Sequence, residues 1–441
     1  MIGFSNIEFL SWQKARFNVF LLQKRIYKSI FVGDFNQAIR IQKLLLLSSS
    51  ARSLAIRFVS KEVLNLSISN FNVKENFIGL LDKFRLSSYL TRFVMNWYPC
   101  TSLDLTIKDI NLFSKDMFLW VVADSCWQCL VKLSIDPACE ALFFPRNLGF
   151  RSHPLVHHVQ RLILMNISRL SYGYQKRVLY IILPNKFNEY SYKFLLKKLF
   201  IPRSIKIGLN RFLNRTSFRS ITTLSFSSLS PLLLNVLYNG IETLHNSIRY
   251  GNEFILFLRP FDNEVNLIKK VLMYISFLGL KKNDLTFNIF NCSSGFNFLG
   301  WFFKASKKHD SFSIPSKENY TLFLRRVKNI INNSNYGSVI KTAKIFPLIQ
   351  EWKFYNTFCD ENSFRTSLFF LRKKAFKVFK DEFKQDKYSS KLLLNKSFFK
   401  LPLKDDVFIS RFISPYDHLF FLYNKNTNSS FCIHCGINAN F

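Results

Sequence analysis

Apolar residues recur at helical spacing through the first sixty residues of the chain. The first predicted helix begins near Trp12, and its apolar stripe consists of Val19, Leu22, Ile26 and Ile30. Gly33 and Asp34 then predict a helix stop followed by an N-cap, because glycine accepts a left-handed conformation and aspartate caps exposed amide groups. Two further helices, reaching to about Ser60, complete a predicted helical N-terminal region.

The middle of the chain mixes strand-like and helix-like patterns. Short runs of strand-forming residues at 178–183, 248–258 and 295–303 predict strands. In the last two stretches the apolar run lies on one side of a turn-like break. Between them, apolar residues of 265–278 recur at helical spacing, and Gly279 follows as a C-terminal stop. The pattern therefore predicts an α+β fold in which strand, helix and strand follow one another behind a polar hairpin.

A basic amphipathic helix is predicted near the C-terminus, from Phe369 to Lys387. At about 100° per residue one narrow stripe collects the lysines Lys373, Lys377, Lys380, Lys384 and Lys387. An adjoining stripe consists of Phe369, Phe376, Phe379 and Phe383. Three interpretations fit this pattern: a surface helix with solvated lysines, a helix lying on a membrane, and a helix docked by phenylalanine whose lysines follow RNA phosphates.

Composition narrows the class of partner. The 441 residues suffice for two to four domains, and 62 Lys and Arg against 28 Asp and Glu give a net charge of +34. Such an excess favours a polyanion, either nucleic acid or a membrane surface. A transmembrane helix is not expected, because we find no run of about 18 uncharged apolar residues. The 51 phenylalanines, with abundant Lys, Asn and Ile, indicate an AT-rich and hence organellar gene.

The eight cysteines do not form a disulfide framework, which indicates a reducing compartment. Cys126 and Cys129 flank Trp127 and are predicted to lie in the core. Cys432 and Cys435 have the C-x-x-C spacing of two zinc ligands, but a structural zinc site needs four. Zinc at this pair stays open, and we otherwise expect no cofactor.

Several segments resemble the group II intron reverse transcriptases. Residues 250–253, Tyr-Gly-Asn-Glu, occupy the place of that family's Tyr-x-Asp-Asp turn, and Phe-Asn-Phe-Leu-Gly at 296–300 resembles its Phe-x-Phe-Leu-Gly. The order of residues from Trp12 to Val59 is similar to the family's N-terminal region. The remaining matching segments are 135–140 with 147–151 (the fingers signature), 230–236 (a Ser-Pro-Leu-Leu-x-Asn helix entry) and 351–355 (domain X of maturases).

The resemblance implies a right-hand polymerase-like fingers and palm, a helical N-terminal region, and a helical thumb with maturase domain X. It divides the chain into a helical N-terminal region (1–65), degenerate fingers and palm (66–305), thumb and domain X (306–390), and a C-terminal tail that contains cysteines (391–441).

Nucleotidyl transfer in such a fold needs two Mg²⁺ ions held by carboxylates. The resemblance places the family's three catalytic aspartates at Ile182, Asn252 and Glu253 here, so one carboxylate remains. We therefore expect a degenerate polymerase site, consisting of Ile182, Tyr250, Asn252 and Glu253, without reverse transcriptase activity. No endonuclease constellation is visible either.

The resemblance and the charge together predict an intron maturase that binds structured intron RNA and assists the splicing of a group II/III-type organellar intron. The expected compartment is the chloroplast, with the mitochondrion as the alternative; no membrane is expected, and a homodimer is left open. The candidate RNA-binding residues are Lys24, Arg25, Lys28, Arg52, Arg57 and the five lysines between 373 and 387. The alternatives are a residual RNA-directed DNA polymerase or mobile-element enzyme, and a generic basic RNA-binding scaffold.

Overall fold

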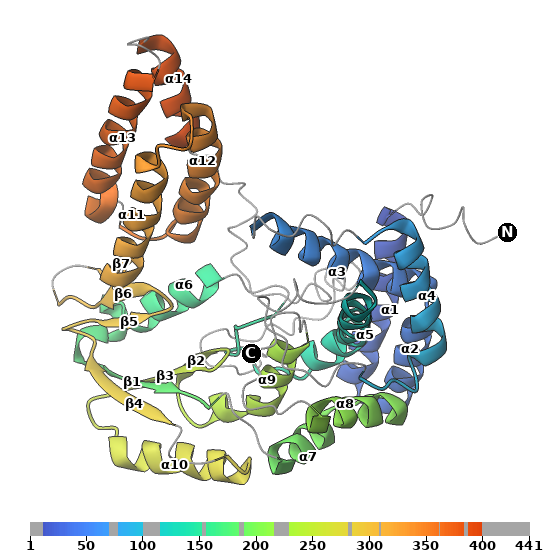
Figure 1. Cartoon of the computed structure of the whole chain (residues 1–441). Coiled ribbons are helices and arrows are strands. Elements are labelled where there is room, and N and C mark those ends of the chain that lie inside the picture. The colour runs from blue at the N-terminus through green and yellow to red at the C-terminus, as the bar shows by residue number, and fades with distance from the viewer. Residues whose placement is uncertain are drawn as a thin grey trace, which may run out of the picture.

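The structure is a computed structural model, and it combines helices with two small antiparallel sheets in an α+β fold (Figure 1). It describes residues 12–69, 78–99, 115–151, 156–184, 189–215, 229–280, 285–307, 310–360, 362–382 and 387–398.

The N-terminal region is helical, as predicted. Its helices are α1 (Trp12–Val32), α2 (Phe35–Leu47), α3 (Ser49–Ser69), α4 (Leu80–Phe93) and α5 (Lys115–Glu140). The predicted boundary between the first two is confirmed: Gly33 has a φ of 89°, and the Asp34 side chain accepts a hydrogen bond of 2.9 Å from the Gln37 amide. The apolar faces of these helices pack around α5.

Helix α5 is the buried centre of this region. By length and composition its segment Phe118–Glu140 could cross a membrane, although no such helix was expected from the sequence. However, 72% of its most apolar 18-residue stretch is buried inside the protein. Cys126 and Cys129 are buried, as predicted, and Trp127 is fully buried with its ring 3.9 Å from that of Trp97. Its composition therefore reflects a core helix surrounded by other helices.

The larger sheet has the strand order β2-β3-β1-β4 and is antiparallel throughout. Its strands are β1 (Arg177–Ile182), β2 (Ser247–Tyr250), β3 (Glu253–Leu258) and β4 (Thr286–Asn291). Around it lie α6 (Val156–Asn166), α7 (Glu189–Lys198), α8 (Arg203–Arg215), α9 (Ser230–Tyr238) and α10 (Glu264–Phe277). Helix α10 is the predicted helix, and Gly279 follows it with a φ of 75°.

The two faces of this sheet are buried against different partners. Leu179 and Leu256 point into the core shared with the N-terminal helices, α9 and α10. Val178 and Ile255 point to the other face, which packs on α6 and the second sheet. This division follows from strand geometry, in which successive side chains alternate between faces.

The second sheet has the order β5-β6-β7, from β5 (Phe296–Phe298), β6 (Trp301–Lys304) and β7 (Phe312–Pro315). The sequence analysis predicted that 295–303 is the strand after α10 in the strand–helix–strand unit behind the hairpin. That prediction was wrong, because these residues belong to the second sheet. The strand that follows α10 is β4, an edge strand that pairs with β1.

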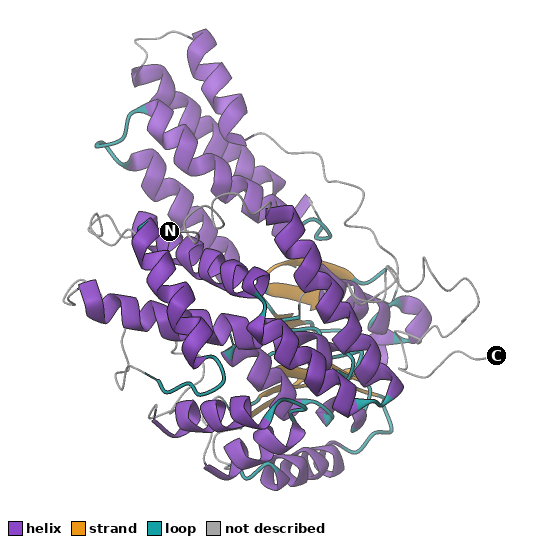
Figure 2. Cartoon of the chain, turned by 90° about the vertical axis from the view of Figure 1, so that its right-hand side faces the viewer, coloured by secondary structure: helices purple, strands orange, loops and turns teal. Residues whose placement is uncertain are grey.

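A C-terminal bundle projects from the rest of the molecule (Figures 1 and 2). It consists of α11 (Lys317–Asn332), α12 (Ser338–Tyr355), α13 (Asn362–Glu382) and α14 (Lys387–Phe398). Their buried side chains form a separate core that includes Phe323, Trp352 and Phe379. The predicted boundary at 305/306 separates β6 from β7 within one sheet, so the structural change to the bundle lies nearer Ser316, the N-cap of α11.

The single basic helix predicted to reach Lys387 is instead parts of two helices. Helix α13 ends at Glu382, and Lys387 begins α14. The buried stripe of α13 is Leu371, Ala375 and Phe379, whereas Phe369 is 63% exposed. The Phe stripe was thus predicted correctly for Phe379 and wrongly for Phe369.

The buried tryptophan of α5 makes a stability test. Trp127→Ala removes a stacked indole and its hydrogen bond to the Val94 carbonyl, so we expect a loss of about 3–5 kcal/mol in the free energy of unfolding. Trp120→Ala on the same helix is the control: this side chain is 48% exposed, and about 1 kcal/mol or less should be lost. Urea unfolding followed by circular dichroism measures both. Equal losses would contradict the central place of α5 in the core.

Candidate functional site

The residues of the predicted degenerate polymerase site lie together. Tyr250 ends β2, Glu253 begins β3, and the two are paired across a two-residue turn. Ile182, the last residue of β1, lies directly opposite Glu253 in the sheet register. The Leu183 amide donates a 2.8 Å hydrogen bond to the Asn252 carbonyl. Strand β1 and the hairpin of β2 and β3 thus bring the four predicted residues to one end of the sheet.

The turn depends on a close approach between two glycines. Gly251 has a φ of 63°, a conformation that costs glycine little. A Cβ atom on Gly149 would lie 2.2 Å from the Gly251 amide nitrogen, so only hydrogen fits there. On the other side, the Phe150 ring lies where a Cβ of residue 251 would be. The Gly-Phe of the fingers signature is therefore part of the turn's own packing.

Glu253 has hydrogen-bond partners on both sides of the sheet interface. The Tyr180 hydroxyl donates to its Oε2 at 3.1 Å, and the Leu299 amide of the β5–β6 turn also donates to this carboxylate. Burial raises the pKa of Glu253, and these two hydrogen bonds oppose that rise. Leu299 is itself held by the Tyr355 hydroxyl of α12, which donates to its carbonyl at 2.5 Å. The remaining carboxylate thus links the sheet to the hairpin and the bundle.

No metal centre is assembled within the described ranges. Nowhere among those residues do three His, Cys, Asp or Glu side chains lie close enough together to hold an ion. Ile182 offers no ligand atom and Asn252 offers an amide, so Glu253 is the one carboxylate of the predicted set. Cys432 and Cys435 lie outside the described residues, and zinc binding there stays a prediction.

A fully buried ion pair lies beneath the turn. The Arg249 Nε donates to Glu242 Oε1 at 2.5 Å, and both side chains are 0% exposed. Arg249 Nη1 also donates to the Gly251 carbonyl at 2.8 Å and to Asn235 Oδ1 at 3.1 Å. The Asn235 amide in turn donates to the Gly149 carbonyl. Arg249 therefore connects the turn to Asn235 within α9 and, through Asn235, to the glycine that faces the turn.

The fingers signature forms a second ion pair nearby. Arg151 binds Glu140 at the end of α5, and the side chains are 4% and 1% exposed. Arg151 Nη1 also donates to the Asn147 carbonyl at 2.8 Å. Glu140 and Arg151 of the signature thus hold one loop against α5.

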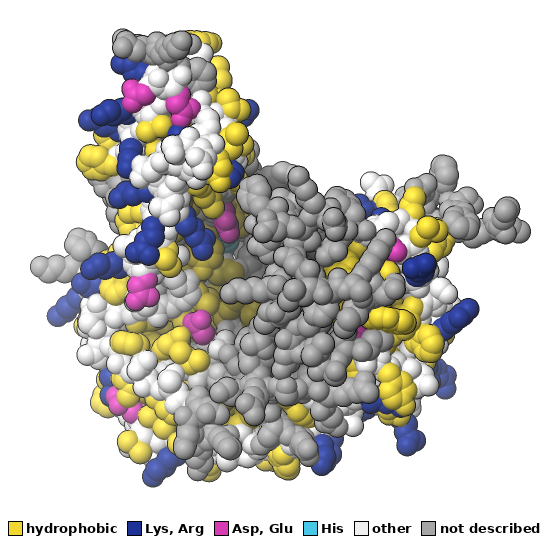
Figure 3. Space-filling model, viewed as in Figure 1, with side chains coloured by type: hydrophobic (Ala, Val, Ile, Leu, Met, Phe, Trp, Pro, Cys, Tyr) yellow, Lys and Arg dark blue, Asp and Glu magenta, His cyan; other side chains and the backbone are white. Residues whose placement is uncertain are grey.

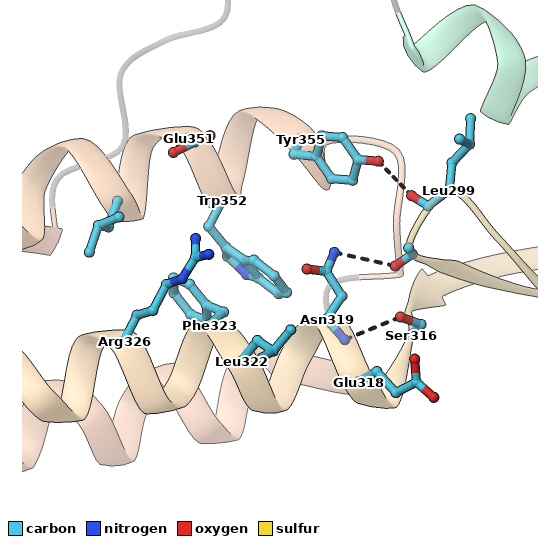
Figure 4. A pocket seen from close by; sticks show the side chains of 12 residues that line it. Leu299, Ser316, Glu318, Asn319, Leu322, Phe323, Arg326, Glu351, Trp352 and Tyr355 are labelled. Atoms are coloured by element: carbon cyan, nitrogen blue, oxygen red, sulfur yellow. Dashed lines mark hydrogen bonds between the residues drawn. The ribbon is translucent and has the colours of Figure 1, made fainter. Parts of the chain in front are cut away.

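The bundle meets the β5–β6 turn through a set of hydrogen bonds (Figure 4). The Ser316 amide donates to the Gly300 carbonyl at 2.9 Å, and Asn319 Nδ2 donates to the same oxygen at 3.4 Å. With the Tyr355 contact to Leu299, these bonds attach α11 and α12 to the hairpin that also contacts Glu253.

A cavity of about 490 Å³ opens at this junction, between α11, α12 and the β5–β6 turn. Trp352 lies in its wall, with its ring stacked 4.1 Å from that of Phe323. Arg326, Glu318 and Glu351 contribute charged groups to the lining (Figure 4). Trp352 and Tyr355 belong to the segment that resembles domain X, so that segment's aromatic residues build this junction.

The N-terminal RNA-binding candidates differ in their surroundings. Arg52 is half-buried, and its Nη1 donates to the Leu47 carbonyl at the end of α2 at 2.8 Å, a helix-capping contact. The Arg57 guanidinium stacks 4.1 Å from the Trp12 ring centre and stays exposed. The α1 candidates are Lys24, which is half-buried, and the exposed Arg25 and Lys28.

On α13, Lys373 and Lys377 are exposed and Lys380 is half-buried, one helical turn apart from one another. Figure 3 shows Lys and Arg side chains along the outside of the C-terminal bundle. Lys384 lies outside the described residues. Lys387 starts α14, so the predicted stripe of five lysines on one helix is reduced to three.

The sequence analysis missed the charged residues that organise the site. Arg249 and Glu242 were not singled out, although an arginine within the apolar run 248–258 is itself a signal of a buried charge pair. Tyr355 was noted only as part of a motif. Its contact with Leu299 joins residues 56 positions apart, which no local pattern predicts.

Comparisons with known proteins place the chain in a family. The N-terminal domain of reverse transcriptase matches residues 8–64, which include α1, α2 and most of α3. The chain is 40% identical over 463 aligned positions to Maturase-like protein 1 of Euglena longa, with 99% of each chain covered. It is 39% identical to Maturase-like protein 1 of Euglena gracilis, with 97% of this chain and 96% of the relative covered.

The domain match places the N-terminal region in the class of proteins related to reverse transcriptases. Since the relatives align over nearly their whole length, the chain belongs to the family of intron maturase-like proteins with a reverse transcriptase N-terminal domain.

The buried ion pair under the turn makes the second test. Glu242→Gln leaves the Arg249 guanidinium buried without its counter-charge, and we expect a loss of about 3–5 kcal/mol in the free energy of unfolding. Glu264→Gln is the matched control, because its pair with Arg177 is partly exposed and should contribute about 1 kcal/mol or less. Chemical denaturation of the two variants measures the difference. A Glu242→Gln variant as stable as the parent would show that the pair does not hold the turn.

Proposed function

We propose that this chain binds a folded organellar intron RNA of the group II/III type and assists its splicing without reverse transcriptase activity. The RNA's own hydroxyl groups perform the chemistry in this proposal, and the protein holds the RNA in its reactive shape. A basic surface that reads RNA shape and phosphates is sufficient for such a role.

One observation carries the proposal. In a chain of the maturase-like family, the end of the sheet that resembles a polymerase's catalytic end pairs Ile182 with Glu253, and Glu253 is held by Tyr180 and Leu299. Two Mg²⁺ ions need several anionic ligands at once, and one carboxylate with an isoleucine beside it does not supply them. The packing of the turn is intact while the ligand set is incomplete.

The charge supports an RNA partner. The net charge is +34, and exposed cations occur on α1, α3 and α13, in both the N-terminal region and the bundle. Cations at both ends suit a large folded RNA better than a short strand, since each neutralised phosphate adds to the affinity. Lys24, Arg25, Lys28, Arg57 and the lysines of α13 are the contacts we propose.

The finer architecture follows from the same resemblance. We assign the four-stranded sheet with its surrounding helices to a polymerase-like palm, the region around α5 and the loop to Arg151 to fingers, and the C-terminal bundle to thumb and domain X. The domain limits become an N-terminal region to about 65, fingers and palm to about 315, and thumb with domain X beyond, followed by the C-terminal tail.

The compartment we propose is an organelle, the chloroplast before the mitochondrion, in keeping with the AT-rich composition. The named partner is structured intron RNA, and the proposal needs neither a cofactor nor a membrane. A homodimer is compatible with it and is not required.

The absence of polymerase chemistry is directly measurable. Purified protein given a primed RNA template, nucleotides and Mg²⁺ or Mn²⁺ should extend no primer, because the metal pair lacks its ligands. Glu253→Gln should leave this result unchanged. Templated extension by the parent protein that is lost in Glu253→Gln would refute the proposal that the site is degenerate.

The α13 lysines allow a test of the proposed RNA contact. Lys373→Gln with Lys377→Gln removes two exposed charges, so the slope of log affinity against log salt for the intron should fall by about 1.5–2, with roughly tenfold weaker binding at low salt. Stability should change little, because exposed charges contribute little to folding.

The matched control is Lys193→Gln with Lys197→Gln, two exposed lysines on α7, the helix at the other end of the molecule from α13 in Figure 1. Filter binding across a salt series compares the two variants. If both pairs weaken binding equally, the effect is one of overall charge, and α13 is not an RNA contact.

A further inference from the structure

A second cavity lies at the end of the four-stranded sheet opposite the turn. Its volume is about 630 Å³, within the range of ~300–1,000 Å³ typical of small-molecule sites. The register pairs Arg177 with Leu258 at this end and Ile182 with Glu253 at the other, five residues or about 17 Å away. The cavity is therefore separate from the degenerate polymerase site.

Four groups that carry or can carry positive charge line this cavity: Arg146, Lys176, Arg259 and His245. Lys176 precedes β1 and Arg259 follows β3, and because these strands are antiparallel neighbours the two cations are brought side by side. The pKa of Lys176 is lowered, first by burial and also by the charge of Arg259, which opposes the attraction of Cys292. The half-buried Lys176 and the exposed Arg259 thus line the same cavity, and their charges repel each other.

The cavity wall is built by hydrogen bonds between polar side chains. Arg146, 8% exposed, donates from Nη1 to Asn246 Oδ1 at 2.6 Å, and Asn246 Nδ2 donates to Asn166 Oδ1 at 3.0 Å. Lys176 Nζ donates to the Asn166 carbonyl at 2.7 Å, and an ammonium group has two further N–H groups. The network fixes a guanidinium and an ammonium in the wall, whatever the cavity contains.

Acidic groups near the cavity have other partners. Glu242 is the one carboxylate in the lining, and its oxygens accept from Arg249 and from the Gly240 amide. Asp262 lies beside the lining, where it is 3.2 Å from His245 Nε2 and accepts from the Arg259 amide. In the part of the chain that the structure describes, the Arg259 side chain makes neither a hydrogen bond nor an ion pair. The balance of charge facing the cavity is therefore positive.

We infer that this cavity binds a phosphate group, and that the phosphate belongs to the intron RNA bound under the proposed function, on which this inference rests. Arginine and lysine together suit a phosphate, the first through paired N–H donors and the second as a point charge. The Asn246 amide donates one of its two N–H groups to Asn166, and the second can bind the phosphate or its ribose. The contact lies away from the turn, so it adds an anchoring point for RNA on the opposite end of the sheet.

The test uses the full-length protein with Lys176→Gln and Arg259→Gln, together and as Arg259→Gln alone. Arg259 is exposed, so the single variant tests the site without disturbing the network around Lys176. The matched control is Lys269→Gln with Lys270→Gln, two exposed lysines on α10. Circular dichroism and thermal unfolding verify that all variants fold.

The first arm is phosphate ethylation interference on the intron RNA that the parent protein selects. Ethylating one or two neighbouring phosphates should block binding to the parent and to the α10 control, and should have no effect on binding to the double variant. The salt slope of the double variant should fall by about 1.5–2, and that of Arg259→Gln by about half as much.

The second arm titrates inorganic phosphate into the protein by calorimetry, without RNA. If the parent binds inorganic phosphate and the double variant does not, while both show the same ethylation interference on the RNA, the cavity binds a small free anion. That result would overturn the RNA as the source of the phosphate. An unchanged ethylation pattern with no phosphate binding would overturn the site altogether.

The two proposals fail separately. If the parent binds its intron no better than an unrelated structured RNA, the proposed function is wrong. If the parent prefers its intron over the unrelated RNA, but the cavity variants bind the intron as the α10 control does, the proposed function stands and the inference about the cavity is wrong.

Discussion

The ion pair between Arg249 and Glu242 is the constraint on which the centre of this protein depends. A charge removed from water is tolerated only with a counter-charge and hydrogen bonds, and Arg249 has both. Because its donors reach Asn235 and the Gly251 carbonyl, the position of the guanidinium fixes α9 and the turn relative to each other. None of these groups is among the positions of the predicted metal ligands, so the turn keeps its shape without them.

The residues that build the sheet are thus different from the residues of the predicted site. The core beneath the sheet is made of Leu179, Leu256 and their neighbours, and it gains its stability from burial. Ile182, at the end of β1, is not among the buried residues of that core, so the identity of this side chain matters little to the packing of the sheet.

Much of the fold was predictable from local pattern. The N-terminal helices, β1 and α10 have clear periodicity and capping residues, and the structure confirms them. Strand β4 was missed because it is an edge strand with largely exposed side chains, which leaves no apolar alternation to detect. The extent of α13 was overestimated, because the spacing of the lysines runs on to Lys387, which belongs to a second helix, α14.

The site was predictable in a different way. Ile182 and Glu253 are 71 positions apart, and only the resemblance to a family placed them together; the register agrees. The partners of Arg249, of Lys176 and of Tyr355 depend on long-range packing, and hydrogen bonds between distant segments leave no periodic trace. Charged residues inside apolar runs were the one local signal for them.

The position of Glu253 ties one side chain to three parts of the molecule. Its carboxylate accepts from the Tyr180 hydroxyl and the Leu299 amide, and the Leu299 carbonyl accepts from Tyr355 of α12. An aspartate at this position is one methylene shorter and withdraws from both donors unless the hairpin moves with it. Under the proposed function, a return to polymerase chemistry therefore requires coordinated changes in the hairpin and the bundle, and evolution could not reach it through position 253 alone.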